Sequence, residues 1–173
     1  MNQSFDTQLQ VMKRALTDVV MPALDGAGNH VLEQLHLSLA VADFMQRRLP
    51  HARRFYRTEL RGYASLAGKI NALLSSQGGN NSDDELQNLF LNADKLISDP
   101  EGEWEDYIEL TRQIRTRISQ LTESASGQSF EDELDNLVLS AAEDASLQAR
   151  IWCVPFGFEL NEDSLPEADW LER

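Results

Sequence analysis

Apolar residues recur along most of this chain at intervals of three and four, the spacing that lines one face of an α-helix. The first stripe consists of Phe5, Leu9, Met12, Leu16 and Val19. It predicts a helix over Ser4–Val20 that ends or kinks at Met21–Pro22, because proline disrupts the helical hydrogen-bond pattern and restricts the residue before it.

Five further stripes predict the remaining helices. They begin at Leu32, Tyr56, Leu86, Trp104 and Phe130. Pro50 either begins the third helix or kinks one long rod, and Asp99–Pro100 is expected to open the fifth by a capping aspartate followed by proline. The inner face of that fifth helix is expected to carry Trp104, Ile108, Thr111, Ile114, Ile118 and Leu121.

The pattern predicts an all-α fold, a bundle of five to six helices. We expect the bundle to occupy residues 1–153, with a flexible loop near the glycine-rich segment 75–84. Residues 154–173 lack a sustained helical stripe. They are expected to form an extended acidic tail that packs on the bundle, with Phe156 and Phe158 as anchors.

Charge restricts the class of partner. The 173 residues suit one domain, and the net charge of −14 opposes binding to nucleic acid and to anionic membrane surfaces. No apolar run reaches the ~20 residues of a membrane span, and the N-terminus does not resemble a signal peptide. With Cys153 as the single cysteine, in an apolar setting that predicts a buried thiol, we expect a cytoplasmic protein without a cofactor.

One stretch departs from this acidity. Gln46–Gly62 holds six arginines and a single acid, Glu59. The candidate binding residues are Arg47, Arg48, Arg53, Arg54, Arg57 and Arg61. Arg53, Arg57 and Arg61 are four residues apart, so on a helix they form one ridge.

Three uses of these arginines stay open. They can pair internally with carboxylates, for which the tail offers Glu159, Glu162, Asp163, Glu167, Asp169 and Glu172. They can grip a small anion, because the guanidinium fork binds phosphate and carboxylate groups through two hydrogen bonds. They can also bind a protein with an acidic face or a second copy of this chain.

A metal site is a further alternative. Glu33-x-x-His36 has the spacing used in carboxylate-bridged di-iron bundles, and Asp43 continues that side of the helix. Such bundles need the motif twice together with two more glutamates, and the sequence contains it once. We therefore assign no metal ligand and keep Glu33, His36 and Asp43 only as candidates.

Part of the N-terminal region resembles a class of small bacterial all-helical proteins of unknown function. The similarity rests on the turn Met21-Pro22-Ala23-Leu24, on Gly26 and on Leu39-Ala40-Val41, while Asp43 and Arg47–Arg48 replace a glutamate–arginine pairing expected late in that helix. Such proteins tend to be encoded beside aminoglycoside-phosphotransferase-like and acyl-CoA-dehydrogenase-like enzymes. The resemblance implies an accessory role near acyl-CoA or phosphoryl-transfer chemistry, with no catalytic residues to transfer.

Taken together, the sequence predicts a non-catalytic accessory or interaction protein of the bacterial cytosol that works through its arginine-rich helix face. The expected partner is another protein or a second copy of the chain. The main alternative is a protein or enzyme that binds a small anion such as phosphate, nucleotide, CoA or carboxylate. The carboxylate–histidine metal bundle is the third.

Overall fold

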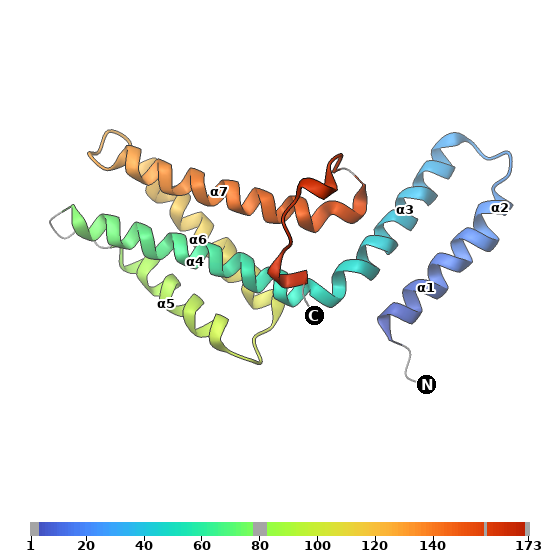
Figure 1. Cartoon of the computed structure of the whole chain (residues 1–173), viewed down its shortest axis with the longest axis horizontal. Coiled ribbons are helices and arrows are strands. Elements are labelled where there is room, and N and C mark those ends of the chain that lie inside the picture. The colour runs from blue at the N-terminus through green and yellow to red at the C-terminus, as the bar shows by residue number, and fades with distance from the viewer. Residues whose placement is uncertain (1–3, 78–82, 158, 172–173) are drawn as a thin grey trace. The chain divides into compact units, whose positions relative to one another are not determined.

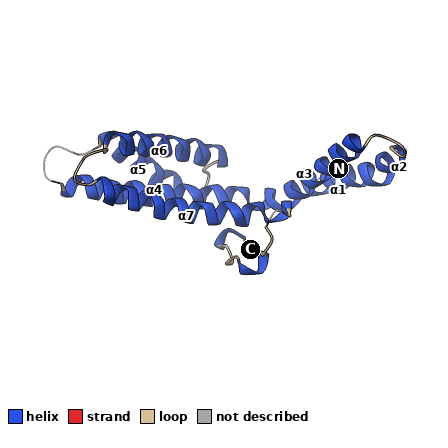
Figure 2. Ribbon diagram, turned by 90° about the horizontal axis from the view of Figure 1, so that it is seen from above, coloured by secondary structure: helices blue, strands red, loops and turns tan. Residues whose placement is uncertain are grey.

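A computed structural model describes residues 4–77, 83–157 and 159–171. Within these residues every regular element is helical and none is a strand, as the colouring of Figure 2 shows. The all-α fold expected from the periodicity is confirmed. No helix in this part of the chain combines the length and the apolar character needed to cross a membrane.

The element bounds follow the apolar stripes closely. The α-helices are α1 Phe5–Ala15, α2 Met21–Ala23, α3 Asn29–Arg48, α4 Ala52–Ser76, α5 Asp84–Ser98, α6 Trp104–Ser124 and α7 Glu131–Cys153. A π-helix, Leu16–Val20, joins α1 to α2, and 3₁₀ turns occur at Leu49–His51, Val154–Phe156, Glu162–Ser164 and Asp169–Leu171. Pro50 therefore lies in a 3₁₀ turn between two helices.

The described residues form two compact units. Unit 1 comprises Met1–His51 and Arg150–Pro166, and unit 2 comprises Ala52–Ala149 and Glu167–Arg173. From the sequence we predicted a helical bundle over residues 1–153 and a tail over 154–173. That division is based on helical periodicity and not on the contacts that define the two units, and it stays a prediction.

Unit 2 contains the larger core. Helices α4, α5 and α6 pack against one another (Figure 1), and Gly68 of α4 lets the Phe90 ring of α5 approach, since a Cβ there would lie 3.3 Å from it. The C-terminal segment joins this unit through Trp170, whose ring lies 5.2 Å from Phe55 and whose Nε1 donates to Gln148 Oε1 at 2.7 Å. The fully buried residues of the core include Leu60, Ala67, Ile70, Leu86, Ala93, Tyr107 and Ile114.

Unit 1 is built on a hairpin of α1 and α3, which lie side by side in Figure 1. The π-helix, a wider helical turn than that of an α-helix, lies directly before Met21–Pro22, where the sequence indicated an end or a kink. Gly26, with φ of +83°, makes the turn before α3. Near the other end of α3, Phe156 stacks on Phe44 with ring centroids 4.1 Å apart, so the anchor role expected of Phe156 is confirmed.

Two local predictions are wrong. Asp99 does not cap the fifth helix: it follows the end of α5, its side chain accepts from the Glu101 N–H, and α6 begins only at Trp104. The tail expected over residues 154–173 is not extended at its start, because Val154–Phe156 forms a 3₁₀ turn that Gly157 ends at φ of +74°. Phe158, the second expected anchor, lies outside the described residues.

Candidate functional site

The six candidate arginines belong to both units and are described unit by unit. In unit 1, Arg47 Nε lies 2.8 Å from Asp43 Oδ2, one turn back on α3. Arg48 is only 7% exposed, and it donates to the carbonyl oxygens of Ile151 at 2.8 Å and Trp152 at 2.9 Å. Burial lowers the pKa of the Arg48 guanidinium. Arg48 therefore holds the C-terminal end of α7 against α3.

In unit 2, Arg53 and Arg57 also bind main-chain oxygens. Arg57 donates from Nε and Nη2 to the carbonyl of Ile97 at 2.9 and 2.5 Å. Arg53 donates to the carbonyls of Gly102, at 2.9 Å, and Pro100. These oxygens lie at and just beyond the C-terminal end of α5, where helix carbonyls lack intrahelical partners and carry partial negative charge. Both arginines thus stabilise the α5–α6 connection.

The expected ridge is therefore only partly available to a ligand. Arg53, Arg54 and Arg61 are exposed, but Arg53 and Arg57 already donate to carbonyls of their own chain. Of the tail acids considered as partners, Glu159 pairs at 2.9 Å with Arg150, an arginine outside the candidate stretch. Glu172 lies beyond the described residues.

The three metal candidates are not arranged as a metal site. Glu33 and His36 are exposed on α3. Asp43 accepts from Lys13 at 2.5 Å and also pairs with Arg47, and the Lys13 hydrogen bond is the main cause that lowers its pKa. In the described ranges, no three His, Cys, Asp or Glu side chains gather in an arrangement that could hold a metal ion.

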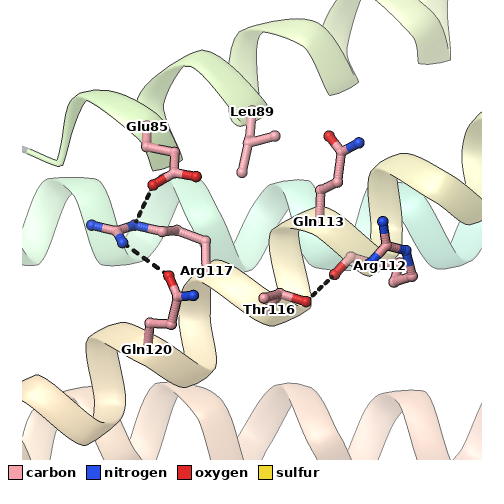
Figure 3. Close-up of a pocket in the computed structure, with 7 residues that line it drawn as sticks. All are labelled: Glu85, Leu89, Arg112, Gln113, Thr116, Arg117 and Gln120. Atoms are coloured by element: carbon pink, nitrogen blue, oxygen red, sulfur yellow. Dashed lines mark hydrogen bonds and ion pairs between the residues drawn. The ribbon is translucent and has the colours of Figure 1, made fainter.

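A hollow of about 180 Å³ lies between α5 and α6 (Figure 3). Across it Arg117 pairs with Asp83 and with Glu85, the latter at 3.3 Å. Burial acts to raise the pKa of Asp83, but hydrogen bonds from Arg117 and from the Leu86 N–H outweigh it and leave that pKa lowered. The second arginine of the hollow, Arg112, pairs with Glu109 at 2.6 Å. Both arginines thus already have carboxylate partners. The ion pairs of Arg117 hold the start of α5 against α6.

The least expected feature is the exposure of the hairpin's apolar residues. No residue of α1 is buried, although α1 carries the first apolar stripe of the sequence. Phe5 is 80% exposed, and Met12, Val41 and Met45 are between 42% and 47% exposed. Only Leu9 and Leu16 of that stripe are partly covered.

Helical geometry places these residues on one side of the hairpin. Successive residues turn by about 100°, so on α1 Phe5 and Met12 lie to one side of the Leu9–Leu16 line and Asp6 and Lys13 to the other. Polar bonds to α3 use that second side: Gln46 donates to Asp6 at 2.6 Å, and Lys13 donates to Asp43.

The two faces of α3 follow the same division. Asp43 and Met45, two residues apart, point in nearly opposite directions on α3, about 200° apart. We call the side defined by Phe5, Met12, Val41 and Met45 the apolar side of the hairpin.

Sequence reasoning missed this surface. The spacing predicted only that the apolar residues of α1 share one face of a helix, because periodicity does not indicate whether another element covers that face. Comparison of the chain with protein-family models, with curated proteins and with solved structures gives no match. The functional argument therefore rests on the residues themselves.

Proposed function

We propose that this protein is a non-catalytic interaction protein that binds another protein through the apolar side of its α1–α3 hairpin. One observation carries the proposal: α1 has a regular apolar stripe and yet no buried residue. Contiguous exposed apolar surface on a folded chain is typical of a protein-binding surface.

The energetics of α1 support this function. Isolated helices shorter than ~12 residues are marginal in water, and most helical stability comes from packing of the apolar face. The helical segment that begins with α1 continues through the π-helix and α2 to Ala23, and of its apolar stripe only Leu9 and Leu16 are partly covered, beside the polar bonds of Asp6 and Lys13. A partner that covers Phe5 and Met12 would supply the missing apolar contacts, each worth about 1.5–3 kcal/mol on full burial.

The arginine-rich face and the anion-binding alternative have less support as the working surface. Arg48, Arg53 and Arg57 donate to main-chain carbonyls, and a ligand would have to displace those bonds. The accessory role implied by the resemblance to small bacterial helical proteins fits an interaction protein, and it enters here only as part of the proposal.

Site-specific photo-crosslinking tests the proposed function. A photo-reactive amino acid replaces Val41 on the apolar side or, as the control, Leu139, which is 62% exposed on α7. In a cell extract we expect a discrete crosslinked protein product from position 41 and none from position 139. Lysine at Phe5 should reduce the yield at least about tenfold, because it puts a charge where the partner packs.

Equal labelling from positions 41 and 139, or no discrete product from position 41, would show that the apolar side does not bind a protein. The comparison controls for exposure alone, since Leu139 is an apolar residue of similar accessibility on another helix.

A further inference from the structure

We propose that the partner of the apolar side is a second copy of this chain, so that two α1–α3 hairpins pair through their apolar sides. This inference rests on the proposed function, because it names the protein that the hairpin binds. Two amphipathic hairpins that bury one side against each other would form a four-helix arrangement, a common stable solution for helical layers.

The distribution of charge points to a second copy. Residues 1–51 contain four basic and five acidic side chains, a net charge of −1, while the whole chain has 15 basic and 29 acidic. The remaining 122 residues therefore carry a net charge of −13. Two copies that meet through their hairpins would join segments of low net charge, between which like-charge repulsion is small.

The apolar side carries one charged residue, Arg48, which lies three residues beyond Met45 and is buried with its guanidinium bound to the carbonyls of Ile151 and Trp152. On α1 the strip at three- and four-residue spacing consists of Phe5, Gln8, Met12 and Ala15, and on α3 the matching strip consists of Gln34, Ser38, Val41 and Met45. The charged residues where α1 meets α3 form hydrogen bonds on the other side of the hairpin. Lys13 donates to Asp43, and Asp6 accepts from Gln46. Pairing of two identical apolar sides would bury no unpaired charge, which is the main cost of a mismatched interface.

The same surface suits other partners less well. A strongly charged partner would find no free opposite charge on this side and would lose hydration without compensation. An identical side offers matched apolar area, with the amide of Gln34 able to donate and accept across a two-fold axis. The self-complementary contact is therefore the one that the side chains favour.

Sedimentation velocity of the purified full-length chain tests the inference. Between about 1 and 100 μM, a range that brackets micromolar affinity, we expect a species of twice the 19.5 kDa chain mass. The double variant Met12→Lys/Met45→Lys should weaken this association at least about 100-fold, since it removes two apolar contacts per chain and places like charges face to face. Both methionines are exposed, so the folded monomer should keep its helical circular dichroism.

Leu139→Lys serves as the matched control and should leave the dimer unchanged. A wild-type chain that stays monomeric to 100 μM overturns the inference, as does a dimer that both variants leave intact. The two proposals fail in different ways. A monomer that still crosslinks from position 41 to a protein of another mass refutes only the second copy, whereas a monomer without any such product refutes the proposed function as well.

Discussion

At the scale of single residues, burial and hydrogen-bond partners decide what a charged side chain does. Glu59 is the one acid of the arginine-rich stretch, and it is partly buried on α4. Burial raises the pKa of its carboxyl, and the nearby charge of Arg115 opposes that rise without cancelling it. The folded state therefore holds the Glu59 proton more tightly than the unfolded chain does.

A raised folded-state pKa means that ionisation of Glu59 weakens the fold. Its contribution is most favourable below its unfolded pKa, near 4.5, and declines as pH rises through the folded value. We predict that Glu59→Gln raises the thermal midpoint at pH 7 by up to about 3 °C and that this gain disappears near pH 4. Melting curves at the two pH values check it, with exposed Glu105→Gln as the control. A gain that persists at pH 4 would mean that the charge is not its source.

At the scale of elements, hydrogen bonds from α4 to main-chain oxygens at and beyond the end of α5 determine how α5 is connected to α6. The end of α5 receives Arg57 at Ile97, and the following connection receives Arg53 at Pro100 and Gly102. Hydrogen bonds from a charged donor to such carbonyls contribute about 1.5–3 kcal/mol each. These two arginines, rather than a capping Asp99, fix the connection between α5 and α6.

We predict that Arg57→Ala lowers the free energy of unfolding by about 1.5–3 kcal/mol, because the Ile97 carbonyl loses its donor. Arg61→Ala, one turn further along α4 at an exposed position, should change it by less than about 0.5 kcal/mol. Urea unfolding followed by circular dichroism measures both. Equal effects of the two substitutions would contradict the capping role of Arg57.

At the scale of the whole molecule, buried apolar surface is distributed unevenly between the two units. The core cluster draws on α4, α5, α6 and α7, whereas α1 and the π-helix after it contribute no buried residue. Local opening free energies rise with buried apolar contact, so the units should differ in protection.

Hydrogen exchange tests this difference. In dilute solution, we expect the amides of α1 to exchange at least about 100-fold faster than those of α4 around Ile70, whose side chain is fully buried. If the hairpin pairs with a second copy, protection of α1 should rise with protein concentration while that of α4 stays constant. Uniform protection of α1 and α4 would show that the hairpin is as stable as the core.

Residue spacing also has limits within a single helix. On α6 the expected inner face included Ile108, which is 41% exposed, and omitted Tyr107, which is fully buried. Cys153, expected to be a buried thiol, is exposed. In each case neighbouring positions have similar hydrophobicity. Which of them is buried depends on the element that packs there and cannot be predicted from the sequence pattern.

The sequence by itself determined the all-α class and most helix bounds. Apolar spacing, glycine turns and proline act over a few residues, so local physics is enough to place them. Only the tertiary structure decided that Arg53 and Arg57 bind carbonyls on another helix and that the stripe of α1 stays uncovered. Both depend on contacts between residues distant in the chain. A stripe or a run of arginines specifies which side chains lie together, and the neighbouring element specifies what they touch.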